Sequence, residues 1–80
     1  MGLTPEDAIR GLLAARGPEK TICPSEAARA LDAEAWRAQM DRVRAAAAAL
    51  ADHGEIEATQ RGEVIDVRTA RGPIRLRAAR

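Results

Sequence analysis

The residue types that could do covalent chemistry are few in this sequence. The single cysteine, Cys23, precedes Pro24-Ser25-Glu26, which places its thiol at a helix N-terminus, where the helix dipole stabilises a thiolate. A nucleophilic cysteine also needs a base, and the only histidine, His53, lies at the far end of another predicted helix. We therefore interpret Cys23 as a helix N-cap and His53 as a helix C-terminal residue, and we expect no catalytic residues and no enzymatic activity.

Metal and cofactor sites are not expected either. One histidine and one cysteine, without a carboxylate at ligand spacing, do not make a metal centre. Glu55 and Glu57 alternate along a predicted strand, which is typical of a solvated face and not of an acid/base pair. The sequence thus leaves non-covalent binding as the expected activity.

Arginine is the residue type that the sequence offers in quantity for binding. Twelve of the 13 basic residues are arginine, although the net charge is only +1. Residues 1–60 have a net charge of −3, whereas residues 61–80 carry six arginines against Glu63 and Asp66, a net charge of +4. The basic end is therefore the part expected to face an anionic partner.

Composition limits what this chain can build. Eighty residues suffice for one domain, which we predict to span 1–80 with a core of about 5–77. Only 17 residues are Val, Ile, Leu, Met or Trp, while 19 are alanine, so a substrate cleft is not expected. With one Trp and no Phe or Tyr, the chain also lacks the aromatic platform of many single-strand RNA binders.

The sequence also bears on location. No apolar stretch approaches the roughly 18 residues that a membrane-spanning helix requires. The first ten residues lack the basic start and apolar stretch of a signal peptide. We expect a cytoplasmic protein that does not insert into membranes.

Capping residues and apolar spacing predict helices in the first half. Thr4 caps a predicted helix over 5–16, which Gly17-Pro18 ends. Residues 20–22 are predicted to be extended, and a second helix is predicted from about Pro24 to Ala30.

Two possibilities remain open for the next segment, which Asp32 can cap. Spacings of 4, 3, 4 and 3 favour one helix over 33–52, in the series Trp36, Met40, Val43, Ala47 and Leu50. Asp41 could instead cap a separate helix over 42–52. In either case Gly54 ends the helix, and Trp36 and Met40 are expected in the core, where Trp36→Ala would cost about 3–5 kcal/mol.

From Glu55 onward the alternation has a period of two, which predicts strands. One strand is predicted around Ile56 and Ala58 and another around Ile65 and Val67, with a tight hairpin turn at 61–62. Residues 74–77 fit a third strand or an extended arm lying on the core. This order predicts an α+β fold, a winged helix-turn-helix with three or four helices and a small antiparallel β-hairpin sheet.

Several of these motifs occur together in one bacterial family. The segments TICPSEAARAL over 21–31 and GPIRL over 72–76, joined by Trp36-Arg37, Met40 and Val43-Arg44, resemble the domain of unknown function 3253. The resemblance covers about residues 8–77. It implies a winged-helix-like fold, usually as a small stand-alone protein, and no established activity.

The winged-helix arrangement predicts which arginines bind nucleic acid. The N-terminal part of a recognition helix enters the major groove, and the wing lies along the backbone or minor groove. Arg42 and Arg44 fit the first role and Arg61 the second, while phosphate contacts are expected from Arg68, Arg75 and Arg77. We therefore expect the chain to bind double-stranded DNA, as a monomer or a dimer.

Two interpretations stay open beside this one. The chain could be a protein-interaction or dimerisation module, in which the alanine face of residues 45–49 packs on a partner helix. Arg29 and Arg37 could form internal ion pairs with Glu26, Glu34 or Asp41, or could contact a ligand.

Overall fold

Capping residues set the first two helices of the computed structural model, which describes residues 2–79. Helix α1 spans Pro5–Arg16, and the Thr4 hydroxyl oxygen accepts a hydrogen bond from the backbone N–H of Asp7 at 3.0 Å. Helix α2 spans Pro24–Leu31, and the Glu26 carboxylate accepts one from the backbone N–H of Cys23 at 2.7 Å. Both helices begin where the sequence predicts.

Helix α3 runs without a break over Trp36–Asp52, which decides between the two possibilities that the sequence left open. Asp41 lies exposed inside this helix. The Asp32 carboxylate accepts hydrogen bonds from the backbone N–H groups of Glu34 and Ala35, at 3.1 and 3.0 Å. Asp32 therefore caps the turn between α2 and α3, and α3 starts at Trp36, three residues later than predicted.

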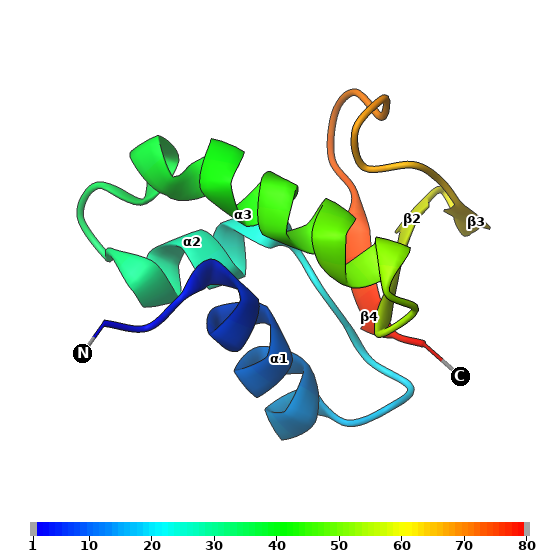
Figure 1. Ribbon diagram of the computed structural model, residues 1–80, viewed down its shortest axis with the longest axis horizontal. Coiled ribbons are helices and arrows are strands. Elements are labelled where there is room, and N and C mark those ends of the chain that lie inside the picture. The colour runs from blue at the N-terminus through cyan, green and yellow to red at the C-terminus, as the bar shows by residue number, and fades with distance from the viewer. Residues whose placement is uncertain (1, 80) are drawn as a thin grey trace.

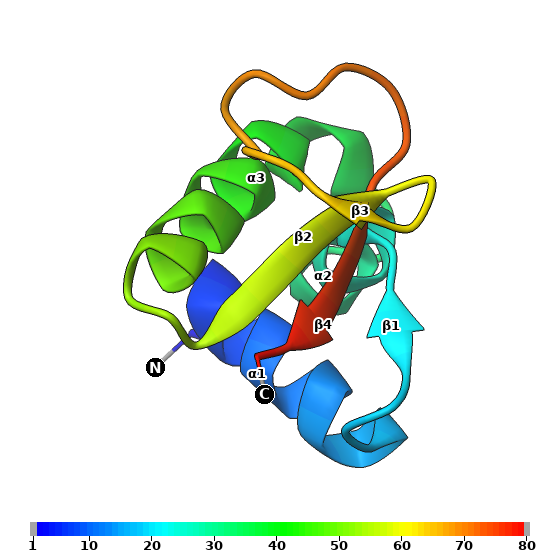
Figure 2. The same ribbon diagram turned by 90° about the vertical axis from the view of Figure 1, so that its right-hand side faces the viewer.

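The strands form one antiparallel sheet in the order β1-β4-β2-β3 (Figure 2). Their bounds are Thr21–Ile22 for β1, Ile56–Gln60 for β2, Glu63–Val64 for β3 and Arg75–Ala78 for β4. Leu76 pairs with Ile22 on one side and with Ala58 on the other. The segment that the sequence left as a strand or an arm is therefore a central strand.

The hairpin that follows β2 turns as predicted but has a shorter second strand. Arg61 and Gly62 have φ angles of 54° and 84°, which are typical of a tight hairpin turn. The strand predicted around Ile65 and Val67 is wrong, because β3 ends at Val64. The reason is Asp66, whose carboxylate accepts a hydrogen bond from the backbone N–H of Arg68 at 2.9 Å and starts a turn.

Residues 65–73, here called the wing loop, connect β3 to β4 and arch over α3 (Figure 1). The β2–β3 turn and the wing loop together are here called the wing. The wing loop rises above α3, whereas the β2–β3 turn lies at the far end of β2, on the other side of the view from α3 (Figure 2).

The three helices cover one face of the sheet (Figures 1 and 2). The inward row of Ile22, Leu76 and Ala58 is buried against them, with Ile9 and Val43 also buried. Trp36 and Met40 are only half-buried at the margin of this core. Trp36 therefore packs against the core as expected but is not fully buried, because it begins α3 at the end of the helix that points away from the sheet.

The predicted α+β class is confirmed, with three helices and a four-stranded antiparallel sheet among residues 2–79. This arrangement is compatible with a winged-helix-like fold. None of the helices in this part of the chain has both the length and the apolar composition that a membrane span needs.

Candidate nucleic-acid interface

The six arginines predicted to bind nucleic acid occupy two surfaces. Arg42 and Arg44 lie on α3, Arg61 lies at the β2–β3 turn, and Arg68 lies in the wing loop. We call this side, formed by the exposed part of α3 and the wing, the α3–wing surface. Arg75 and Arg77 lie on β4 on either side of inward-facing Leu76, so their side chains lie on the opposite face of the sheet.

Arg44 connects α3 to the wing loop. Its Nη2 donates a hydrogen bond to the backbone carbonyl oxygen of Ala70 at 3.0 Å. A hollow of about 360 Å³ opens beside it between α3 and the wing loop, lined by Asp41, Arg44, Ala45, Ala48, Val67 and Arg68. Arg44 has no carboxylate partner within residues 2–79, so its positive charge stays available there.

Arg68 is neutralised by a carboxylate. Its Nη1 and Nη2 donate to the two carboxylate oxygens of Asp52 at 3.1 and 2.7 Å. These hydrogen bonds, with the charge of Arg68, hold the pKa of Asp52 below its ordinary value of 3.8 and raise that of Arg68. Arg68 therefore ties the wing loop to the end of α3 and adds little free charge.

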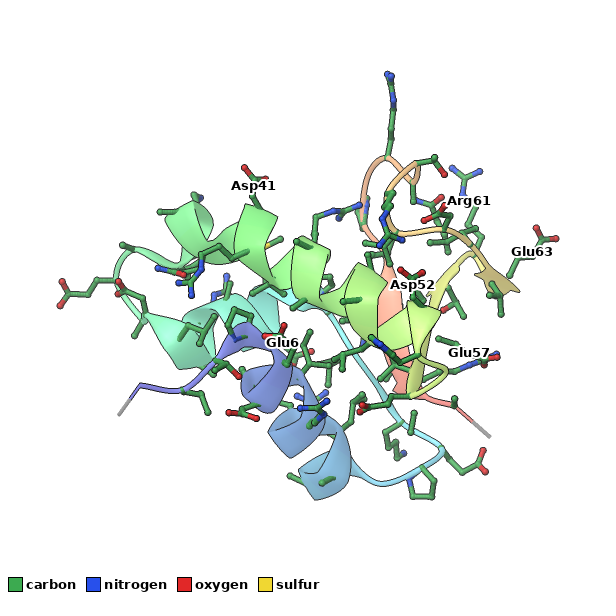
Figure 3. All side chains as sticks on the ribbon, in the orientation of Figure 1. Glu6, Asp41, Asp52, Glu57, Arg61 and Glu63 are labelled. Carbon is green, nitrogen blue, oxygen red and sulfur yellow. The ribbon has the colours of Figure 1, made fainter. Side chains whose placement is uncertain are left out.

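The remaining α3–wing arginines are exposed. The Arg42 Nη1 donates to the side-chain oxygen of Gln39 at 2.8 Å. Figure 3 shows Arg61 and Glu63 on the β2–β3 hairpin, with Glu63 projecting away from the molecule. Arg71, in the wing loop, is a further exposed arginine that the sequence reasoning did not select. Within residues 2–79, neither Arg61 nor Arg71 has a carboxylate partner.

The arginines of β4 form contacts across the outer sheet face. Arg77 pairs with Glu57 on β2, with its Nε 2.9 Å from a carboxylate oxygen. The Arg75 Nε donates to the hydroxyl oxygen of Thr21 on β1 at 2.9 Å. The structure therefore separates both residues from the α3–wing surface.

Arg29 and Arg37 form none of the ion pairs that the sequence allowed. Glu26 pairs with Arg16 of α1 instead. The guanidinium carbons of Arg29 and Arg37 lie 4.4 and 4.3 Å from the centroid of the Trp36 ring. The sequence reasoning missed this cluster, and the signal that could have found it is an arginine next to the only tryptophan, with another at the end of the preceding helix.

One known protein family matches nearly the whole of this chain. The model of a family described as a protein of unknown function, DUF3253, matches residues 3–79. The chain belongs to the DUF3253 family. The resemblance inferred from the sequence motifs is confirmed, and no curated protein matches this DUF3253 protein.

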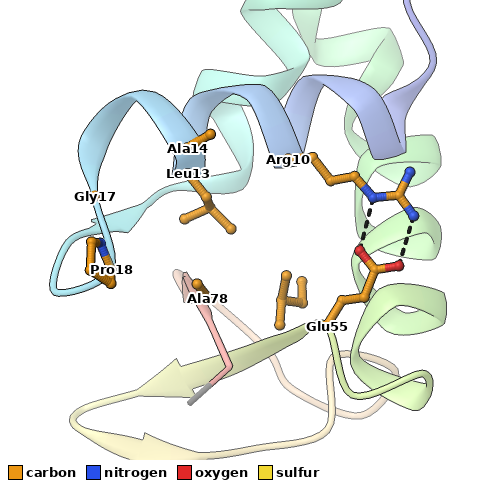
Figure 4. Close-up of a pocket in the computed structure, with 8 residues that line it drawn as sticks. Arg10, Leu13, Ala14, Gly17, Pro18, Glu55 and Ala78 are labelled. Atoms are coloured by element: carbon orange, nitrogen blue, oxygen red, sulfur yellow. Dashed lines mark hydrogen bonds and ion pairs between the residues drawn. The ribbon is translucent and has the colours of Figure 1, made fainter.

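Outside the α3–wing surface, the DUF3253 protein has an apolar groove of about 350 Å³ between α1 and the sheet (Figure 4). Leu13, Pro18 and Ile56 line it. Arg10 closes one end by donating to both carboxylate oxygens of Glu55, each at 2.8 Å. These bonds hold the pKa of Glu55 below its ordinary 4.5. The two charged side chains that line the groove, Arg10 and Glu55, are therefore paired with each other.

Cys23 and His53 have the local roles that the sequence suggested. Cys23 is the N-cap residue of α2, and its sulfur accepts a hydrogen bond from the Ser25 hydroxyl at 3.3 Å. The His53 Nδ1 lies 2.8 Å from the backbone carbonyl oxygen of Ala49 at the end of α3. Among residues 2–79, no group of three or more His, Cys, Asp and Glu could hold a metal ion.

Glu26 makes the stability of the DUF3253 protein depend on pH. The hydrogen bond from the Cys23 N–H, with the contact to Arg16, lowers its pKa below the ordinary 4.5. A lowered folded-state pKa stabilises the protein above the unfolded-state pKa, and this stabilisation is lost as the pH falls through the folded-state pKa. Glu26→Ala should therefore cost about 1 kcal/mol at neutral pH and less below pH 4.5.

Urea denaturation of both proteins at neutral and acid pH measures this difference. Glu34→Ala is the control, because Glu34 is exposed and its carboxylate has no partner within residues 2–79. A Glu26→Ala deficit that stays constant as the pH falls would show that the carboxylate charge contributes nothing.

Proposed function

We propose that this protein is a cytoplasmic, non-catalytic module that binds double-stranded DNA through its α3–wing surface. The observation that carries the proposal is where the unneutralised arginines lie. In the part of the chain that the structure describes, four arginines without a carboxylate partner lie on the middle of α3 and on the wing: Arg42, Arg44, Arg61 and Arg71. Arg37, at the start of α3, is a fifth and contacts Trp36. Arg10, Arg16 and Arg77, on α1 and the sheet, are instead each paired with a glutamate, whereas Arg75 on the sheet donates to Thr21.

The geometry of α3 suits approach to a duplex. Its outward side carries short side chains at Ala38 and Ala45, which let the helix backbone come close to a surface. The wing loop rises above α3 (Figure 1) and can follow the phosphate backbone, as wings do in winged helices. Arg42 and Arg44 flank Ala45, and Arg61 and Arg71 extend the positive surface along the wing.

The same surface sets the expected selectivity. Its exposed polar groups near the start of α3 are few, so hydrogen bonds to base edges are few as well. Asp41 lies exposed on this side and opposes phosphate. We therefore infer that phosphate contacts dominate and that binding is weak, with a Kd of about 1–100 μM at physiological salt.

The alternative function was a protein-interaction module in which a partner helix packs on residues 45–49. Most of that surface is buried inside the folded chain and cannot contact a partner. Ala46, Ala47 and Ala48 are buried in the chain's own core. Only Ala45 is exposed, and Ala49 is half-buried.

Fluorescence anisotropy with a labelled duplex of about 20 base pairs, at about 50 mM salt, tests the proposal. We expect saturable binding that Arg42→Ala/Arg61→Ala/Arg71→Ala weakens at least about tenfold. Arg10→Ala/Arg75→Ala/Arg77→Ala removes the same charge from α1 and the sheet and should change the Kd less than about threefold.

Circular dichroism first confirms that each variant is folded. Folded wild-type protein that does not bind at tens of micromolar would refute duplex binding. Equal weakening by both triple variants would refute the assignment to the α3–wing surface.

A further inference from the structure

The corner between α2 and α3 holds two arginines against one aromatic ring. Trp36 is the first residue of α3 and is half-buried, while Arg29, from the last turn of α2, and Arg37 are both exposed. The two guanidinium carbons lie 4.4 and 4.3 Å from the Trp36 centroid. They are therefore no farther apart than twice 4.4 Å, which is close for two positive charges.

Nearby carboxylates do not neutralise this pair within the described residues. Asp32 uses its carboxylate to accept the backbone N–H groups of Glu34 and Ala35 in the α2–α3 turn. Glu26 is bound to Arg16. Glu34 is exposed and forms no ion pair, and the first turn of α3 contains no acidic residue. Within the described residues, neither guanidinium of the corner is therefore ion-paired with a carboxylate.

Stacking prepares these guanidiniums for a ligand. A guanidinium that lies with its face over a ring keeps its N–H donors, which point outward in its own plane, free for hydrogen bonds. Each stacking contact is worth about 0.5–1 kcal/mol at an exposed site and restricts the side chain before any ligand arrives. The ordering cost of binding is reduced accordingly.

We propose that Arg29, Trp36 and Arg37 form a phosphate-binding site. The fork of N–H groups on each guanidinium matches two oxygens of a phosphate, so the two forks beside this ring can each bind phosphate oxygens. The phosphate can belong to a nucleic-acid backbone or to a free phosphate compound. The first source rests on the proposed function, since the corner is at the N-terminal end of α3, whereas the site itself does not.

Trp36 allows a direct test, because it is the only tryptophan and its emission reports on the ring between the arginines. Titration with sodium pyrophosphate should change the Trp36 emission saturably, beyond the change caused by sodium chloride at equal ionic strength. Arg29→Ala/Arg37→Ala should abolish the response, and Arg29→Lys/Arg37→Lys should weaken binding about tenfold, because lysine keeps the charge but loses the fork.

The matched control is Lys20→Ala/Arg75→Ala, which removes two exposed cations away from the corner and from the α3–wing surface and should leave the response intact. The second arm measures duplex affinity against salt concentration. Arg29→Ala/Arg37→Ala should make the slope of log K against log salt shallower by about two if the site binds backbone phosphates.

The outcomes separate this site from the proposed function. A response to pyrophosphate with an unchanged duplex slope, or with no duplex binding by the wild type, supports the site with free phosphate as its ligand. A shallower duplex slope supports it with backbone phosphate as the ligand. No specific response to pyrophosphate, together with an unchanged slope or no duplex binding, overturns the site.

Discussion

Leu76→Ala should lower the free energy of unfolding by about 2–5 kcal/mol, which is a large part of the margin of a domain this small. Leu76 is fully buried in β4, between Ile22 of β1 and Ala58 of β2. Its truncation removes apolar contacts from both neighbouring strands and from the helices beneath them, and the short strands cannot collapse to fill the space. Urea denaturation followed by far-ultraviolet circular dichroism measures the loss.

The matched control for Leu76→Ala is Val64→Ala. Val64 is also an apolar strand residue, but it lies at the sheet edge and is 58% exposed. Its truncation should change stability by less than about 0.5 kcal/mol. Equal losses for the two variants would contradict the central position of β4.

Duplex affinity should fall roughly 100-fold between about 50 and 200 mM salt, if the four α3–wing arginines each neutralise one phosphate. Arg42, Arg44, Arg61 and Arg71 have no carboxylate to exchange for a phosphate within the described residues. Each phosphate contact releases condensed counterions, so the slope of log K against log salt should be about −3.6. Anisotropy titrations at several salt concentrations measure this slope.

Two variants assign the slope to residues. Arg61→Ala/Arg71→Ala should make it shallower by about two, because two phosphate contacts are lost. Arg77→Ala should leave it unchanged, because the Arg77 guanidinium is bound to Glu57 on the opposite face of the sheet. A slope near zero for the wild type would mean that binding is not electrostatic.

Local features were predictable where a few neighbouring residues decide them. The Thr4 cap, the start of α2 at Pro24 and the turn at Arg61-Gly62 each depend on hydrogen bonds or backbone angles within four residues. The extra length predicted for the second hairpin strand failed for an equally local reason. The Asp66 turn competes with strand pairing, and alternation alone does not weigh that competition.

The candidate site was less predictable, because charge pairing links residues far apart in sequence. Arg68 and Asp52 are 16 positions apart, and Arg77 and Glu57 are 20 apart. The sequence reasoning selected both arginines for nucleic acid, yet each has a carboxylate partner in the folded chain. It did not select Arg71, which the fold leaves exposed on the wing.

By itself, the sequence determined the helices, the hairpin turn, the α+β class and the family, because propensity, capping and periodicity act over a few residues and the family motifs are contiguous. Only the tertiary structure decided that β4 lies between β1 and β2, that α3 is unbroken and that Trp36 stacks with Arg29 and Arg37. These depend on packing between distant segments. Which arginines keep their charge free depends on it as well, because an ion pair forms only where the fold brings a carboxylate within reach.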